Sequence, residues 1–366
     1  MKSPTPCLMT GPYDFSEAHL PRSVFEARIG RVREKMRTRG VGRLAVHGNA
    51  FDHAALAWLT NFTPKLGPAF ALIEAEGPLK MLFSGGPGMK PSALALTFVE
   101  DMTPARGGSD VGAWLAEGVA RGLKPGLVEG EAMMQETWRG VSSPLGDAKL
   151  VLLDGDFDAL RRKRAPEERK VLASAFDFLD STFRMAPIFA RDMKRRALMV
   201  ALEAAGYAYG AQDVRVLLSR RDFGPAEPLT DGKERLAAPA QLAIALRHRG
   251  HWVTGRAMIG PVPKAALKTA RETIETAAGA LRPGRVAEFS SIAKSARVEI
   301  HGVGLSVEEA PRAGETIVEG DVLNIVVTIG KARACVFSAM ALVEKKSARL
   351  LWASPELETD IPRFEG

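Results

Sequence analysis

The stretch IHGVGLSVEEAP, residues 300–311, is the part of this sequence that decides its fold. It places His301 next to two glycines, Gly302 and Gly304, and glycine allows a backbone to turn closely past a neighbouring group. A histidine in such a loop can donate or accept a proton or bind a carboxylate, because its intrinsic pKa of about 6.5 is easily moved. His301 is therefore the candidate catalytic residue. The alternative is that its ring only hydrogen-bonds to neighbouring backbone.

Residues 300–311 resemble the His-Gly-x-Gly-Leu…His-Glu-x-Pro segment of the creatinase, prolidase and proline-specific aminopeptidase family. Two other stretches are similar to segments of the same family. Residues 57–62, AWLTNF, are similar to its Tyr-Leu-Thr-Gly-Phe stretch, and residues 161–168 look like its interdomain junction, where Pro-Glu-Glu opens a long helix. The resemblance implies an α/β (α+β) protein, in which a creatinase-like α/β domain precedes a pita-bread (creatinase/aminopeptidase) domain.

The pattern of the chain predicts the bounds of these domains. An irregular leader covers residues 1–22, the creatinase-like N-terminal domain covers 23–158, and the pita-bread domain covers 159–366. Apolar periodicity predicts helices that alternate with strands in the first domain. The expected helices are 23–39, with Ser23 as its cap and Gly40 as its end, 109–123, which Pro125-Gly126 ends, 167–185, 191–206 and 265–281. The expected strands are 44–46, 69–73, 81–83, 150–153, 242–246, 252–259, 322–329 and 340–343.

The resembling family holds two divalent cations with two aspartates, one histidine and two glutamates, and only the histidine is kept here, as His301. Residues 235–271, where the aspartates would fall, contain neither Asp nor Glu. The same holds for residues 322–343, where the resemblance places Val326 and Ser338 at the glutamate positions. Paired divalent cations need several carboxylates around them, since the cations otherwise repel each other. With four of five ligands absent, we predict no metal and no cofactor.

Creatinase works without metals, and it uses an upstream histidine together with glutamates that hold the substrate. The corresponding loop here, residues 218–236, contains no histidine. The glutamates are missing as well. The sequence therefore does not favour a creatinase-like hydrolysis.

Basic residues occupy the hairpin where the resemblance implies two aspartates. Arg247 and Arg256 lie in this hairpin, and Arg333 follows another strand that borders the family's cleft. Because a guanidinium binds a carboxylate or phosphate through two parallel hydrogen bonds, these arginines are candidate binding residues for a small anionic ligand. The alternative is that residues 247–250 form a solvent-facing turn, where charge is ordinary. Only Arg256, on the outgoing strand, is expected to face the interior.

Glu308 and Glu309 stand where the resembling family has His-Glu, and they complete the set of candidate substrate-binding residues. Adjacent residues on a strand point to opposite faces, so only one of the two carboxylates can face a pocket. Catalysis by this pair is therefore not expected. The alternative is a solvated or structural pair.

Composition limits the functional classes. The chain has 366 residues, 46% of them hydrophobic and 25% charged, and its net charge of +7 comes from scattered basic residues. No nucleic-acid-binding motif accompanies them, so a nucleic acid is not an expected partner. Cys7 and Cys335 are too few for a disulfide scaffold. No stretch has the pattern of a signal peptide or a membrane span, so we expect a cytoplasmic protein without a membrane partner.

Three functions are consistent with these observations. The first is a non-catalytic binding or regulatory subunit, in a homodimer or in a heterodimer with a related, active family member. The second is a metal-independent enzyme that acts on a small anionic or amide substrate through His301. The third is a metallopeptidase of the aminopeptidase P or prolidase type whose ligands are displaced. Resemblance of fold does not by itself establish peptidase activity, so the sequence leaves open whether the chain is an enzyme.

Overall fold

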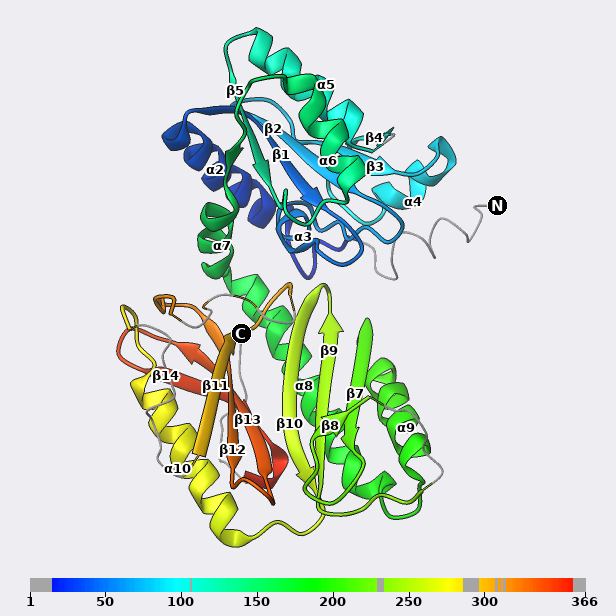
Figure 1. Cartoon of the computed structure of the whole chain (residues 1–366), viewed down its shortest axis with the longest axis vertical. Coiled ribbons are helices and arrows are strands. Elements are labelled where there is room, and N and C mark those ends of the chain that lie inside the picture. The colour runs from blue at the N-terminus through cyan, green and yellow to red at the C-terminus, as the bar shows by residue number, and fades with distance from the viewer. Residues whose placement is uncertain are drawn as a thin grey trace. The chain divides into compact units, whose positions relative to one another are not determined.

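The computed structural model describes residues 15–105, 107–228, 234–285, 296–306, 309, 311 and 314–357 (Figure 1). The chain divides into two compact units, Met1–Arg161 and Arg162–Gly366. The sequence pattern had predicted a division just before this point, after residue 158. Each unit contains its own sheets and its own apolar core.

The N-terminal unit is built on one mixed sheet. Its strands are β1 (Val41–Gly48), β2 (Ala69–Glu74), β3 (Lys80–Ser84), β4 (Asp101–Ala105), β5 (Lys124–Val128) and β6 (Val151–Leu152), in the order β4-β3-β2-β1-β5-β6. Its helices are α2 (Arg22–Arg39), α3 (Ala54–Thr60), α4 (Lys90–Leu94), α5 (Gly108–Ala120), α6 (Gln135–Ser142) and α7 (Asp154–Arg162). Buried apolar side chains of α5 and α6 pack against β1, β2 and β5, and they are Val111, Leu115 and Val141 with Ala45, Leu72 and Leu127.

Element ends in this unit follow local backbone rules. Gly40 ends α2 in the left-handed region, with φ 67°, as the sequence predicted. Asn61 ends α3 with φ 63°, in the place where the similar stretch of the family has glycine, because asparagine tolerates this conformation. Two expectations were wrong. Ser23 does not cap α2, which begins one residue earlier without a side-chain cap, and Pro125-Gly126 lies inside β5, where an irregular register with β1 accommodates the proline.

The C-terminal unit contains two four-stranded sheets. The first has strands β7 (Asp213–Ser219), β8 (Ala226–Glu227), β9 (Ala240–His248) and β10 (His251–Ile259), in the order β10-β9-β7-β8. The second has strands β11 (Ala296–Gly302), β12 (Val322–Ile329), β13 (Cys335–Val343) and β14 (Ala348–Ala353), in that order. The helices are α8 (Pro166–Phe189), α9 (Arg195–Ala208) and α10 (Lys264–Ala280).

Helices cover one face of each of these sheets, as Figure 1 shows. α8 and α9 pack on the first sheet through an apolar cluster that includes Leu172, Phe176, Leu179, Leu198, Val214, Val216, Leu242 and Ile244. α10 packs on the second sheet through a cluster that includes Ala270, Ile274, Ala277, Ile325, Val327 and Phe337. The opposite faces of the two sheets are therefore the ones that can carry a functional site.

The junction motif has the predicted structure. Pro166 begins α8, and the Glu168 carboxylate accepts a hydrogen bond from the backbone N–H of Ala165 at 2.9 Å. Proline at the first helical turn and acids beside it suit the positive end of a helix. β12 has the bounds that the sequence predicted, whereas β7, β11 and β14 were not predicted.

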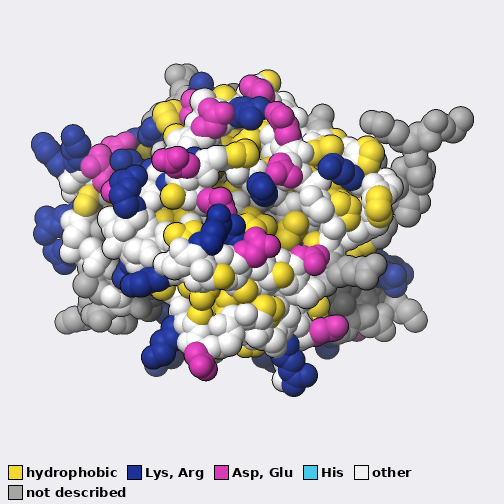
Figure 2. Space-filling model, turned by 90° about the horizontal axis from the view of Figure 1, so that it is seen from above, with side chains coloured by type: hydrophobic (Ala, Val, Ile, Leu, Met, Phe, Trp, Pro, Cys, Tyr) yellow, Lys and Arg dark blue, Asp and Glu magenta, His cyan; other side chains and the backbone are white. Residues whose placement is uncertain are grey.

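Two broader properties follow from the described part of the chain. None of its helices combines the length and the apolar composition that a membrane span requires. Acidic and basic side chains lie intermixed with apolar ones on the face that Figure 2 shows. This mixture agrees with scattered basic residues in the sequence.

Candidate functional site

Strand register identifies the side chains that share the faces opposite the helices, because directly opposed residues of antiparallel strands point to the same side. On the first sheet, the face opposite α8 and α9 carries Arg215, Leu217, Ala243, Ala245, Arg247, Trp252, Thr254 and Arg256. We call it the first inner face. On the second sheet, the face opposite α10 carries Glu299, His301, Asn324, Val326 and Ser338. We call it the second inner face.

His301 lies on the second inner face, directly opposite Asn324. Asn324 is only 1% exposed, and its amide Nδ2 lies 2.8 Å from Thr254 Oγ1 and 3.3 Å from His301 Nε2. In this orientation the amide donates to both groups, and His301 Nε2 is the acceptor of one of these hydrogen bonds. With the amide turned over, His301 Nε2–H would donate to the amide oxygen. Either arrangement engages His301 Nε2 in the protein's own hydrogen bonding.

The positions at which the resemblance implies glutamate ligands lie together with His301. Val326 pairs directly with Ser338 on one side and with Glu299 on the other, all on the second inner face. Valine offers no ligand atom and a serine hydroxyl is neutral. No group of three or more His, Cys, Asp or Glu side chains within the described residues is placed to hold a metal ion. The described residues therefore do not fit the two divalent cations that the resemblance implies.

Ser338 instead joins the two sheets. It is fully buried, and its hydroxyl accepts a hydrogen bond from the backbone N–H of Arg256 at 2.7 Å. The Ser354 hydroxyl donates to the Arg256 carbonyl oxygen at 2.6 Å and accepts from the Ser338 N–H at 2.8 Å. Since β10 and β13 belong to different sheets, these hydroxyls take the place of strand pairing between them.

A second polar group surrounds Trp252 on the first inner face. The guanidinium carbon of Arg247 lies 5.4 Å from the Trp252 ring centroid, and that of Arg215 lies 5.1 Å from the same ring. Arg215 also pairs with Asp213 at 3.6 Å. The backbone N–H of Trp252 donates to the backbone carbonyl oxygen of Gly304 at 2.6 Å. The residues around Trp252 therefore adjoin the loop that follows His301. We call Asp213, Arg215, Arg247 and Trp252 the tryptophan cluster.

The structure reverses the expectation for the basic hairpin. Arg247 is only 5% exposed, so it is not part of a solvent-facing turn, which consists of residues 249–250 alone. Arg256 lies on the first inner face as expected, but its side chain is exposed to solvent. The difference has a packing cause, because Arg247 pairs across the sheet with the large Trp252, whereas Arg256 pairs with the small Ala243.

Arg333 is not brought to Arg247. Its guanidinium carbon lies 4.8 Å from the ring of Phe223, and both residues line a cavity of about 500 Å³. The other walls of this cavity are Pro239, Pro261, Val262, Pro263, Ala266, Ile329, Gly330 and Cys335. Burial raises the pKa of the Cys335 thiol, which disfavours a reactive thiolate. Along β12, Ile329 is roughly 17 Å from Asn324 at the usual rise per residue, so Arg333 belongs to a different part of the unit.

Glu309 holds the loop after β11. Its Oε1 accepts hydrogen bonds from the backbone N–H groups of Leu305 at 2.8 Å and Ser306 at 3.2 Å. Its Oε2 lies 3.4 Å from Arg164 Nη2, and both side chains are 5% exposed. The carboxylate thus positions the backbone beside His301. Glu308, the other acidic candidate, lies outside the described residues.

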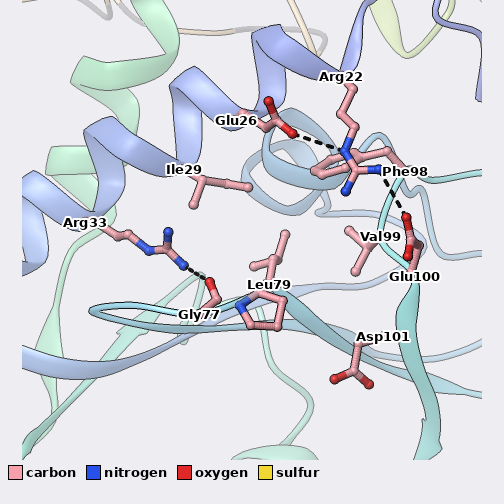
Figure 3. Close-up of a pocket in the computed structure, with 11 residues that line it drawn as sticks. Arg22, Glu26, Ile29, Arg33, Gly77, Leu79, Phe98, Val99, Glu100 and Asp101 are labelled. Atoms are coloured by element: carbon pink, nitrogen blue, oxygen red, sulfur yellow. Dashed lines mark hydrogen bonds and ion pairs between the residues drawn. The ribbon is translucent and has the colours of Figure 1, made fainter.

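The N-terminal unit has a cavity of about 440 Å³ beside α2 (Figure 3). The arginines that line it, Arg22 and Arg33, already form ion pairs or hydrogen bonds with other residues. Arg22 lies 3.1 Å from Glu26 and 3.1 Å from Glu100, and the hydrogen bond that Arg22 donates to Glu100 raises the pKa of Arg22. Arg33 donates to the backbone carbonyl oxygen of Gly77. An anionic ligand in this cavity would therefore have to compete with existing partners of the arginines, and we regard the tryptophan cluster as the better candidate site.

Four residues of these inner faces were not predicted from the sequence to belong to a site: Arg215, Trp252, Thr254 and Asn324. A signal existed for one of them, because Asn324 is a polar residue inside the otherwise apolar run of residues 322–327. A buried polar side chain in such a run must find a hydrogen-bond partner. The other three carry no comparable local signal.

The chain has the pita-bread fold of the proline-specific peptidases, as the sequence predicted. Solved structures confirm this fold over most of the chain. Prolidase from Pyrococcus horikoshii OT3 matches with a TM-score of 0.70 and 16% identity, covering 88% of this chain and 97% of its own. X-Pro aminopeptidase from Thermotoga maritima MSB8 matches with a TM-score of 0.71 and 17% identity, covering 92% and 98%.

A third solved structure is named as a domain of a complex subunit and not as a peptidase. The N-terminal domain of FACT complex subunit SPT16 from Cicer arietinum (chickpea) matches with a TM-score of 0.61 and 14% identity, covering 90% of this chain and 96% of its own. No model of a protein family and no curated protein sequence matches the chain. At such identities the likeness establishes a shared fold and leaves the activity open.

Proposed function

We propose that this chain is a non-catalytic binding or regulatory protein that keeps the pita-bread fold without its dinuclear metal chemistry. The observation that carries the proposal is the shortage of carboxylates among the described residues of the second inner face. Val326 and Ser338 stand where the resemblance implies carboxylates, and Asn324 engages His301. Glu299 is the one described carboxylate on this face, and a single carboxylate that already pairs with Arg297 does not suffice for two divalent cations, which are what activate water in metal-dependent hydrolysis.

The likeness to a complex subunit supports this proposal. SPT16 is named as a subunit of the FACT complex, so the fold occurs in a protein that acts within an assembly. We propose a homodimer, or a heterodimer with a related chain that carries the full set of metal ligands, in the cytoplasm. Light scattering on the purified protein tests the first arrangement, and a monomer at micromolar concentration would count against it.

Metal content tests the central claim. We expect protein purified without chelators to contain far less than one manganese, zinc or cobalt ion per chain by elemental mass spectrometry. We also expect no cleavage of Xaa-Pro dipeptides after addition of Mn²⁺. Prolidase from Pyrococcus horikoshii, prepared in the same way, is the positive control. Two tightly bound ions per chain together with metal-dependent cleavage would overturn the proposal.

Metal-independent catalysis through His301 is the second candidate. It is favoured by the position of His301, which is partly exposed on the same face as Asn324. If a screen of small amides and anions finds turnover, His301→Ala should abolish it while the circular dichroism spectrum stays unchanged. Unchanged turnover in this variant would remove His301 from the mechanism.

A metallopeptidase with displaced ligands is the third candidate, and Glu299 is the described residue that favours it. Glu299 lies two residues from His301 on the same face, and it pairs with Arg297 at 2.8 Å. If metal were found in the protein, Glu299→Gln should release it. Retention of the metal in this variant would exclude Glu299 as a ligand.

A further inference from the structure

Arg247 is a buried cation without a hydrogen-bonded partner. It is 5% exposed, and its Nε is buried with no hydrogen-bond partner among the described residues. Burial lowers the pKa of Arg247, while nearby Asp213 raises it and Arg215 lowers it further. A buried charge that lacks such a partner costs folding free energy. A residue of this kind is expected where a ligand completes its hydrogen bonding.

The charges of the tryptophan cluster do not balance. Arg215 and Arg247 both lie against the Trp252 ring, and the cluster contains one carboxylate, that of Asp213. Asp213 forms its ion pair with Arg215 at 3.6 Å and attracts Arg247 as well, so one carboxylate faces two guanidinium groups. Contact with an aromatic face stabilises a cation, but the ring offers no oxygen acceptor for the guanidinium N–H groups.

Apolar side chains lie beside this charge on the first inner face. β9 is flanked by β7 and β10, and it contributes Ala243 and Ala245, both only partly buried. Leu217 on β7 is directly opposite Ala243 and is also partly buried. A ligand whose anionic group pairs with Arg247 would therefore place an apolar body on these three side chains.

We propose that Arg247 and Arg215 bind the carboxylate or phosphate group of a small organic anion, whose apolar part lies on Leu217, Ala243 and Ala245. This inference rests on the proposed binding function and gives that function a ligand class. The planar guanidinium forms paired hydrogen bonds with either oxyanion. Trp252 fixes the position of both arginines.

Isothermal titration calorimetry on EDTA-treated protein tests the proposal with butyrate, its uncharged amide butyramide and inorganic phosphate. We expect saturable binding of an anionic probe and no binding of butyramide. Tighter binding of butyrate identifies a carboxylate ligand, and tighter binding of phosphate identifies a phosphate ligand. Arg247→Met keeps a long side chain and removes the charge, so it should weaken binding about 10- to 100-fold. Arg215→Met should weaken it in the same direction.

Arg184→Met is the matched control. It removes the same charge from an exposed arginine of α8 that pairs with Asp180 at 2.6 Å, and it should leave binding unchanged. Because Arg247 is buried without a hydrogen-bonded partner, Arg247→Met should keep or raise the Tm measured by circular dichroism. Weaker binding by this stably folded variant, with normal binding by the control, would support the site.

Several outcomes would overturn the proposal. These are no binding of either anion, equal binding of butyramide and butyrate, or equal loss in the Arg184→Met control. A large drop in Tm for Arg247→Met would show that this arginine stabilises the fold instead. Since the titrations use metal-free protein, their failure leaves the proposed function standing. Conversely, two tightly bound metal ions per chain with metal-dependent cleavage in the untreated protein would overturn the proposed function, and the anion site could still be measured.

Discussion

The amide of Asn324 determines what His301 can do. It joins His301 to Thr254 on the other sheet, so the histidine is one member of a buried network. The sequence predicted the positions of His301, Val326 and Ser338, because each belongs to a recognisable local stretch. It could not predict the partners of His301, because Thr254 and Asn324 are far apart along the chain and meet only when the sheets fold together.

Glu356 makes the stability of the protein depend on pH. Burial raises the pKa of Glu356 to about 7 from an unfolded value of 4.5. The folded protein therefore holds this proton more tightly, and the associated stability is present below pH 4.5 and is lost as the pH rises to about 7. Glu356 should contribute a loss of about 3 kcal/mol across this window, measured as the free energy of urea unfolding. Burial lowers the pKa of His47 to about 4, which makes the contribution of His47 rise with pH over much of the same window, so the effect of Glu356 is measured as the difference between the unaltered protein and Glu356→Gln.

The control for this experiment is Glu344→Gln, which removes an exposed carboxylate that pairs with Arg349 at 2.9 Å. It should keep the pH dependence of the unaltered protein. Parallel curves for Glu356→Gln and the unaltered protein would show that Glu356 is not the group responsible.

Among whole elements, the sequence predicted those with strong local signals. Pro166 with the acids after it predicts the start of α8, and the apolar run of β12 predicts a strand buried on both faces. β7 and β11 alternate apolar with charged residues, and they were missed because each is short and lies beside a segment without a clear pattern. Without β7, Arg215 could not be placed beside Trp252, so the tryptophan cluster could not be predicted either.

The loop after β11 depends on one buried ion pair. Glu309→Gln would leave Arg164 without its charged partner, and an uncompensated buried charge is costly. We expect the free energy of unfolding to fall by about 2 to 4 kcal/mol in chemical denaturation. Glu299→Gln, which breaks an exposed pair on the adjacent strand, should change it by less than about 1 kcal/mol. Equal effects of the two variants would contradict the role assigned to Glu309.

For the whole molecule, the fold is shared with proteins whose sequences differ widely from this one. Prolidases match the chain almost end to end at 16% identity, although no family model does. Apolar faces of the right periodicity are enough to specify such a fold, because packing tolerates exchange among hydrophobic residues of similar volume. Residues that bind a metal ion cannot be exchanged in this way without loss of the metal site. A comparison of folds therefore leaves the function open.

The effect of metal ions on the melting temperature tests whether this chain has the fold without the dinuclear metal site. A ligand that binds only the folded state at a thousand times its Kd stabilises that state by about 4 kcal/mol. A dinuclear protein should therefore lose several degrees of Tm in EDTA and regain them with Mn²⁺. We expect the Tm of this protein to be the same in both, by differential scanning calorimetry. A rise with Mn²⁺ that saturates at two ions per chain would contradict the proposed function.

Ser338 limits any attempt to build a dinuclear metal centre on the second inner face. A carboxylate introduced there would not enter vacant space, because the hydroxyl is bonded to Arg256 and occupies the seam between two sheets. The larger, charged group would separate β10 from β13 before it met a cation. Introducing carboxylates one at a time would thus damage the scaffold first, so metal chemistry on this face would require coordinated changes on both strands.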